Sequence, residues 1–600
     1  MVAVRVAQGV SIAGSLRTAG HVRGVMDAAG HVIRQGAGGS ANRLLSARND
    51  LLGIPCAGTA VPHRGAGRFV PEPERGGGSG SACLHSRERA CALGAFTHDV
   101  TANHQRRRAE GEDVLAVMLR TLVKDSAVYA VGTIASRLVG FIMIPVYTRV
   151  LTPADYGIIE TVVRLVDIIS LFLALGLAEA LLRHYYLAKD EEDRRRLVGT
   201  VFNLNLTVVM VGSLLTIPFS PYLTRLAFGH DRYTHYVTVS LVSMLVGNLI
   251  ELPLTVWRAE GKAWRFTVAS LLKLTTQLAT NIILVVWLRW GVWGVVLSGL
   301  LNALAWSIAL GIPVRLRYGM QFDMRWLKPV LRYGLPLVPA ALSQFVLHFS
   351  DRFFLTRYAT EAELGLYSLA YRFGMLVSAF YGIVSLAWGP WAFKAAHMDG
   401  SETHLRRATS LILVGFSLVA NGVILFARPA IHLMSAPRFW AAADYVPVLA
   451  VAYWFFIVQG PLSVGVRIAN RTIFLAIANM AVAGVCLFLN FAWIPAYHVW
   501  GAIWATLISF VVLVLGVGWG SLRYHRLFVD WRMAGCSMLG MGLAVWLDRI
   551  AIGGEPQMIL WRGTAWGVIS GAALWLLKRR IGSSFALLGG RINASVIELS

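Results

Sequence analysis

Apolar segments of about 20 residues recur along most of this chain and alternate with short polar stretches. A helix of that length crosses the hydrocarbon core of a bilayer, which is about 30 Å thick. Between Asp125 and Leu577 the pattern predicts about 14 spans, near residues 126–147, 157–182, 198–219, 236–256, 266–288, 292–313, 333–355, 365–388, 410–427, 443–464, 473–494, 500–521, 533–551 and 559–577. The predicted fold is an all-α polytopic membrane protein.

Two parts of the apolar region resemble each other in sequence. The ten residues Thr148–Gly157 recur as Thr356–Gly365, with five identities and an offset of 208 (356 − 148). A second pair, Val292–Gly294 and Val499–Gly501, has an offset of 207 (499 − 292). Two matches with nearly the same offset indicate an internal duplication, which is common in secondary transporters.

The duplicated unit contains six spans, so both copies enter the membrane with the same orientation. We therefore expect two six-helix lobes, residues 118–320 and 321–528, related by a pseudo-twofold axis along the membrane normal. Such lobes face each other across a central cavity. Residues 529–581 would add two further spans to the second lobe.

The two ends of the chain differ from the spans. Residues 1–117 are rich in glycine and arginine and have no sustained apolar period, which favours disorder. The alternative is that translation starts at Met118, which directly precedes a basic segment and the first span. Residues 582–600 are expected to be a cytoplasmic tail.

Lysine and arginine are divided unevenly between the loops on the two sides of the predicted membrane. The loops that follow even-numbered spans 2–12 carry 21 of them, whereas the loops on the opposite side carry about 9. The positive-inside rule places the first set of loops in the cytoplasm. Both termini are then cytoplasmic, because the predicted number of spans is even.

Composition narrows the class of protein further. The chain is 56% hydrophobic and only 14% charged, where a soluble protein would carry about 25% charged residues. The formal net charge of +23 fits basic loops better than a nucleic-acid-binding module, because no basic or aromatic-basic module stands apart from the spans. The five cysteines form no metal-ligand spacing, and no phosphate-binding loop motif is present. We therefore expect no nucleic acid, no metal, no cofactor and no ATP hydrolysis.

Charged residues inside spans are costly and are candidates for functional sites. Arg137 falls near the middle of the first span without an acid close in sequence. Lys273 lies in the fifth span, on a polar stripe, and is a further candidate for substrate binding, although it could also extend toward the interface. Glu251 precedes a proline in the fourth span and is a candidate for coupling transport to a proton or ion.

The second span places Glu160, Arg164 and Asp167 on one helix face. The two acids can neutralise Arg164 locally, which is a structural interpretation of all three, and Asp167 is also a candidate for ion coupling. Arg164 has an equivalent in Arg372, at the offset of 208, and Arg372 has no acid within one helical turn. Paired arginines from two facing lobes would converge on the cavity, and their planar donors suit phosphate oxygens.

The seventh span contains a neighbouring acid and base, Asp351 and Arg352. As adjacent residues on a helix they are not expected to face each other. Asp351 is a candidate for ion coupling and Arg352 for substrate binding. The alternative is that both lie near the outer boundary of the membrane.

Three segments make the chain similar to a known family. Leu122–Ser126 leading into Ile142–Gly157 resembles the opening of bacterial polysaccharide-export flippases, the Wzx-like O-antigen proteins of the multidrug/oligosaccharidyl-lipid/polysaccharide superfamily. Trp500–Thr506 resembles a Gly-Ala-Ala-x-Ala-Thr pattern of the same family. The resemblance covers about residues 118–525.

The resemblance implies a MATE-like fold and a transporter rather than an enzyme. The implied function is alternating-access movement of undecaprenyl-pyrophosphate-linked oligosaccharide from the cytoplasmic to the periplasmic leaflet of the inner membrane, in contact with membrane lipids, a polysaccharide polymerase and other export machinery. In related lipid II flippases, cavity arginines on spans 1, 2 and 8 are implicated in substrate binding, and Arg137, Arg164 and Arg372 stand at comparable places. The alternative is a MATE-type multidrug/cation antiporter, whose cavity should be acidic and aromatic.

Overall fold

The computed structural model describes most of the predicted membrane region. The described residues are 141, 143–319, 321–396, 401–524, 526, 529–550 and 555–581. Arg137, the segment 1–117, most of the first predicted span and the tail 582–600 lie outside these residues, so the expectations about them stay predictions.

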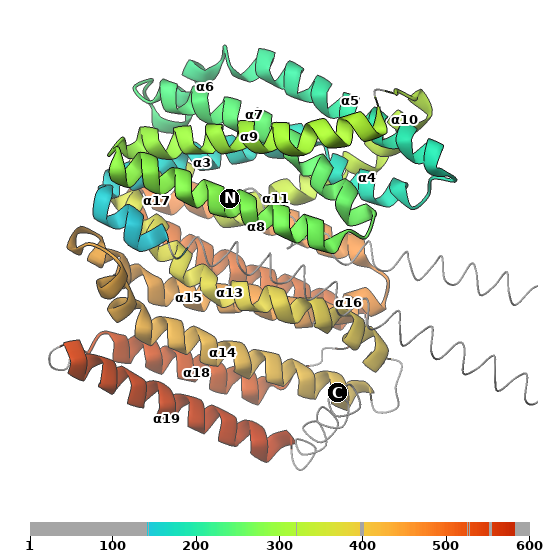
Figure 1. Ribbon diagram of the computed structural model, residues 1–600. Helices are drawn as coiled ribbons and strands as arrows, with labels where there is room; N and C mark the ends of the chain where they lie inside the picture. The colour runs from blue at the N-terminus through green and yellow to red at the C-terminus, as the bar shows by residue number, and fades with distance from the viewer. Residues whose placement is uncertain are drawn as a thin grey trace, which may run out of the picture. The chain divides into compact units, whose positions relative to one another are not determined.

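Helices make up nearly all of the first half of the described chain (Figure 1). They are α3 (Pro153–Ala174), α4 (Leu177–Tyr185), α5 (Glu191–Thr216), α6 (Ser220–Phe228), α7 (Thr234–Ala259), α8 (Ala263–Asn281), the π-helix η2 (Ile282–Trp287) and α9 (Gly291–Tyr318). α3 and α4 together form the second predicted span, broken at Leu175 and Gly176, which both have left-handed backbone.

The second half begins with a short amphipathic helix and continues as long apolar ones. The elements are α10 (Met324–Gly334), α11 (Leu337–Phe349), α12 (Asp351–Tyr358), α13 (Glu361–Ala396), α14 (Ser401–Met434), the 3-10 helix η3 (Pro437–Tyr445), α15 (Val446–Leu462), α16 (Val464–Ile468), α17 (Thr472–Tyr524), α18 (Trp531–Asp548) and α19 (Glu555–Ile581). Figure 1 shows α14, α18 and α19 side by side, and the three helices pack against one another.

Nine helical segments among the described residues are long and apolar enough to cross a membrane. Their hydrophobic windows are largely exposed in several cases, as expected for surfaces that face lipid. The longest, Thr472–Tyr524, contains non-helical backbone at His498 and covers two predicted spans. Helices occupy the positions of predicted spans 2–14, but the total number of spans stays a prediction.

The two copies of the repeated segment begin their helices in the same way. Thr152 precedes α3, and its backbone N–H and hydroxyl both donate to the Asp155 carboxylate, while the Asp155 N–H donates back to the Thr152 hydroxyl. Thr360 and Glu363 form the same reciprocal arrangement at the start of α13. This capping box satisfies N–H groups that a helix start leaves free, which explains why Asp155 is matched by an acid.

The last residues of the repeated segment, Gly157 and Gly365, lie against each other where α3 crosses α13. A Cβ atom added to Gly157 would lie 3.0 Å from the carbonyl carbon of Glu361, and one added to Gly365 would lie 2.8 Å from the carbonyl carbon of Pro153. Each added Cβ would also lie 3.2 Å from the other glycine's nitrogen. Such reciprocal contacts are those of a twofold-related pair and support the predicted duplication.

The second repeated segment also has matching backbone in both copies. Gly291 precedes Val292 with φ 57°, and His498 precedes Val499 with φ 47°. Glycine adopts this left-handed region without strain, whereas histidine does not. The helix break therefore occurs at the same place in both copies, although only the first copy has the residue that suits it.

Candidate functional site

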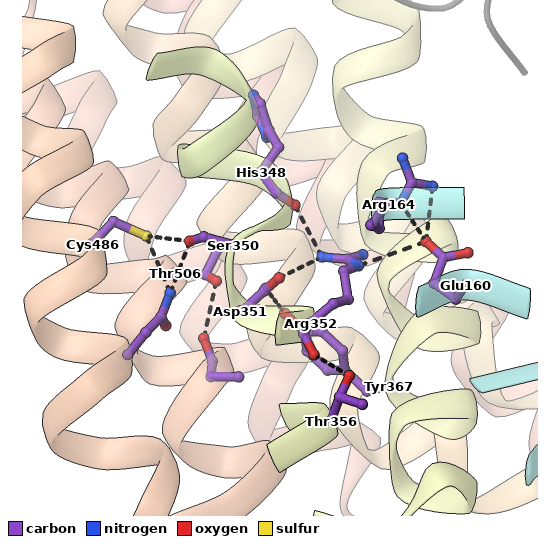
Figure 2. Close-up of polar contacts among 12 residues, drawn as sticks. Glu160, Arg164, His348, Ser350, Asp351, Arg352, Thr356, Tyr367, Cys486 and Thr506 are labelled. Carbon is purple, nitrogen blue, oxygen red and sulfur yellow. Dashed lines mark hydrogen bonds and ion pairs between the residues drawn. The ribbon is translucent and has the colours of Figure 1, made fainter. Parts of the chain in front are cut away.

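Six charged side chains from α3, α12 and α13 are joined by ion pairs and form what we call the charged cluster. Its members are Glu160, Arg164, Asp167, Asp351, Arg352 and Arg372. Figure 2 shows side chains of α3 and α12 that point toward one another. The spacing of the three residues of α3 places them on one helix face, as predicted from the sequence.

Glu160 is the hub of the charged cluster and is only 3% exposed. Its carboxylate pairs with Arg164 of the same helix at 2.8 Å, with Arg352 at 3.6 Å and with Arg372 at 3.5 Å. The last two arginines come from the second half of the chain. A carboxylate that contributes to three ion pairs offsets part of the desolvation cost of burial.

Arg164 forms both local pairs that its sequence neighbours allow. Its guanidinium contacts Glu160 and also Asp167, at 2.9 Å. It lies over the ring of Phe349 at 4.1 Å from the centroid, a cation–π contact with α11. The local-neutralisation interpretation therefore describes the Arg164 ion pairs correctly.

Asp351 and Arg352 contradict the expectation that they do not face each other. They do contact each other, with 2.7 Å between Arg352 Nη1 and Asp351 Oδ1, because the long arginine side chain folds back along α12. They are also buried, at 4% and 1% exposure, whereas their depth in the membrane stays a prediction. Tyr367 of α13 donates a hydrogen bond to the other Asp351 oxygen, and the His348 carbonyl accepts one from Arg352 (Figure 2).

Arg372 has no acid within one helical turn, but it has an acidic partner in the folded chain. It pairs with Glu160, which is 212 residues away in sequence and belongs to the other half of the chain. Arg372 also lies over the Tyr156 ring at 5.1 Å. Its side chain keeps 19% exposure, compared with 13% for Arg164 and 2% for Arg352.

Within the charged cluster, three arginines are balanced by three carboxylates. The charged cluster is therefore neutral overall, and Arg137, the third predicted cavity arginine, lies outside the described residues. Aromatic rings line the charged cluster, because Arg352 lies 4.0 Å from the Tyr371 centroid and 5.3 Å from that of Tyr367. The combination favours anion recognition only if a ligand can replace one of the carboxylates.

The two other candidates, Lys273 and Glu251, lie on α8 and α7, which contribute no side chain to the charged cluster. Glu251 interacts electrostatically with Lys273 and with Glu179 of α4. The backbone carbonyl oxygen of Lys273 accepts hydrogen bonds from the Thr276 hydroxyl and from the Asn302 side-chain amide.

A second polar group escaped the sequence analysis. Asn490 of α17 donates to the Ser350 hydroxyl at 3.1 Å and contacts the Cys486 sulfur at 3.7 Å. Asn490 is fully buried, and its side-chain oxygen has no hydrogen-bond partner among the described residues. An asparagine within an apolar predicted span was the available signal. In the described part of the chain no three His, Cys, Asp or Glu residues form a metal-binding group.

Comparison with known proteins tests the predicted resemblance to polysaccharide-export proteins. Residues 146–388 match a family model described as "Polysaccharide biosynthesis protein". The predicted resemblance is confirmed. Similar curated proteins include the Lsg locus putative protein 1 of Haemophilus influenzae, 24% identical over 45% of this chain and 66% of that protein. The succinoglycan biosynthesis transport protein ExoT of Rhizobium meliloti is 20% identical over 54% of this chain and 69% of that protein.

Solved structures agree on the fold. The superposition on the lipid II flippase MurJ in an inward closed conformation covers 76% of this chain and 99% of the MurJ chain, with a TM-score of 0.61 and 14% identity. An inward-facing multidrug resistance MATE family transporter covers 66% of this chain and 94% of its own, with a TM-score of 0.50 and 17% identity. The predicted all-α, multi-span, MATE-like fold is confirmed, whereas the exact number of spans and the duplication stay predictions.

Proposed function

We propose that this protein moves an undecaprenyl-pyrophosphate-linked oligosaccharide from the cytoplasmic to the periplasmic leaflet of the bacterial inner membrane by alternating access. The family match and the names of the relatives support a role in polysaccharide biosynthesis and transport. The fold shared with a flippase and a MATE transporter supports a transporter rather than an enzyme. The proposal includes membrane lipids, a polysaccharide polymerase and export machinery as partners, and cytoplasmic termini.

One observation carries the proposal: arginines from both halves of the chain converge on one point. Arg164 comes from α3, whereas Arg352 and Arg372 come from α12 and α13, and all three lie around Glu160. Guanidinium groups bind phosphate oxygens through two parallel hydrogen bonds. A site shared between two lobes changes its access when the lobes rock, which is what translocation requires.

The energy source is part of the same proposal. An ion gradient or the membrane potential would drive the movement, with Asp167, Glu251 and Asp351 as candidate coupling residues. Asp351 is already engaged by Arg352 and Tyr367. Asp167 is 14% exposed and is therefore the better placed carboxylate of the charged cluster for exchanging a proton with water.

The test compares substitutions of Arg372 in vesicles that contain the purified protein. A fluorescent lipid-linked pyrophosphoryl disaccharide is the probe, and a membrane-impermeant quencher measures the fraction translocated. Arg372→Lys keeps the charge but loses the planar donors, so it should impair translocation in part, and Arg372→Ala should nearly abolish it. Glu160 keeps Arg164 and Arg352 as partners in both variants, so folding should survive.

The matched control is Arg579→Ala, because Arg579 is exposed on α19 and lies over Trp575. It should flip the probe at the normal rate and show the same membrane level as the Arg372 variants. Normal translocation by Arg372→Ala would refute the proposed role of the arginines.

The MATE-type multidrug/cation antiporter is retained on one observation. Such an antiporter should have an acidic and aromatic cavity, and the charged cluster contains three carboxylates that would attract organic cations. The same vesicles should accumulate no ethidium against a proton gradient if the flippase proposal is right. Ethidium transport that Glu160→Gln abolishes would favour the antiporter.

A further inference from the structure

The contacts of Glu160 are uneven, and the unevenness follows the boundary between the two halves of the chain. Its bonds to Arg164, within α3, are 2.8 and 2.9 Å long. Its contacts with Arg352 and Arg372, across the boundary, are 3.6 and 3.5 Å. Hydrogen bonds between charged groups are usually about 2.7–2.9 Å, so only the Arg164 pair is fully formed.

The two arginines of the second half therefore keep unused donors. Arg352 Nε is buried and has no hydrogen-bond partner among the described residues. Arg372 makes one long contact through Nη2 and otherwise lies over an aromatic ring. Buried donors without partners are costly, so a better acceptor at this position would stabilise both side chains.

Glu160 connects the two halves of the chain within the charged cluster. Asp167 pairs with Arg164 in the same helix, and Asp351 pairs with Arg352 in the same helix. When α3 moves away from α12 and α13, Glu160 keeps Arg164 and leaves as part of a paired group. Separation of α3 from α12 and α13 then leaves Arg352 and Arg372 with free hydrogen-bond donors, while Glu160 stays paired with Arg164.

We propose that Glu160 is a resident anion of this site, which occupies the place where phosphate oxygens of the substrate bind Arg352 and Arg372. In this arrangement Arg164 is a positioning residue that holds Glu160. Binding of a pyrophosphate group and the Glu160 contacts exclude each other, so the substrate loosens the connection between α3 and the second half. This inference rests on the proposed function, because it assigns the phosphate to Arg352 and Arg372, two of the three arginines proposed there.

Glu160→Gln tests the exchange, because glutamine has the shape of glutamate without its charge. The probe is inorganic pyrophosphate, titrated against the thermal stability of the purified full-length protein, with sulfate at equal ionic strength as the reference. The half-saturating pyrophosphate concentration should fall about tenfold in Glu160→Gln, because the competing carboxylate charge is gone. The control is Asp444→Asn, which removes a carboxylate that is 54% exposed and pairs with Arg428. It should match the wild type.

The outcomes separate this inference from the proposed function. If the wild type binds pyrophosphate and Glu160→Gln binds it equally or more weakly, the exchange is wrong and the arginine site stands. If pyrophosphate stabilises neither protein, the arginine site itself is wrong, and the exchange fails with it.

A second measurement needs no substitution of Glu160. Spin labels on cysteines introduced at Arg232 and Leu433, two exposed positions in different halves, report the separation of the halves. The native cysteines are replaced by serine in this protein. Pyrophosphate should lengthen the label-to-label distance, whereas sulfate should not. An unchanged distance at saturating pyrophosphate overturns the exchange even if Glu160→Gln does not fold.

Discussion

Replacing Gly365 by alanine should force α13 away from α3 at the face predicted to be periplasmic. The two helices cross with Gly157 and Gly365 in mutual backbone contact, so neither position has room for a side chain. Other contacts close the same face, since Arg438 of η3 donates to the carbonyl oxygens of Thr148 and Arg149, near the end of the helical residues 143–150. The structure is therefore closed there, and the glycines set how closely the helices approach.

The size of the effect follows from the contact distances. The new Cβ would lie 2.8 Å from the carbonyl carbon of Pro153. Carbon atoms normally approach to about 3.5–4.0 Å, so the helices must separate by roughly 1 Å. Overpacking of this kind costs about 1–3 kcal/mol. A cost borne only by the closed state shifts the population toward the open state by about 5- to 150-fold.

The assay is the distance between spin labels at Arg232 and Leu433, measured without ligand. Gly365→Ala should populate longer distances, and Gly157→Ala should do the same. The double variant should destabilise the closed state by less than the sum of the two single variants, because one displacement of the helices relieves both clashes. The control is Gly311→Ala in α9, where an added Cβ meets no atom within 4 Å. Identical distance distributions for Gly365→Ala and Gly311→Ala would refute the reasoning.

Three further predictions follow from other parts of the fold. His498→Gly should raise the free energy of unfolding by about 1 kcal/mol, because histidine is strained at φ 47° and ψ −124°; an unchanged or lower thermal midpoint contradicts this. Arg562 is 1% exposed and binds Asp548 at 2.9 Å, so Arg562→Ala should destabilise the protein by about 3–5 kcal/mol. It should also make α18 and α19 sensitive to proteolysis, whereas Arg579→Ala should not, and equal protease resistance of the two variants would contradict this prediction. The uneven Lys/Arg distribution predicts that reporter fusions after Lys189, Arg317 and Arg523 are cytoplasmic and that a fusion near Ser435 is periplasmic. A periplasmic signal after Arg317 would contradict the lobe arrangement.

The positions of the helices were predictable from the sequence because their causes are local. A run of apolar residues must be helical in a membrane, since lipid offers no partners for free backbone groups. The start of α3 was likewise encoded by a threonine and an acid three residues apart, and the same pair starts α13. The repeated segment was visible for the same reason, because each copy preserves the residues that its own helix start requires.

Local spacing also predicted part of the charged cluster. Glu160, Arg164 and Asp167 had to share a face of α3, and both expected ion pairs form. The contact between Asp351 and Arg352 was missed, because the spacing rule describes where side chains leave the helix and not where a long flexible side chain ends. The side chains that bury both residues belong to other helices, and the spacing along one helix does not reveal them.

Only the tertiary structure decided which charges meet across the two halves. Arg372 finds Glu160 at a separation of 212 residues, and no periodicity within either helix indicates that their faces are opposed. That opposition depends on the crossing of α3 and α13, where two glycines allow the backbones to touch. Helical faces are set by a period of 3.6 residues along one segment, whereas the partner of a face is set by the packing of the whole bundle.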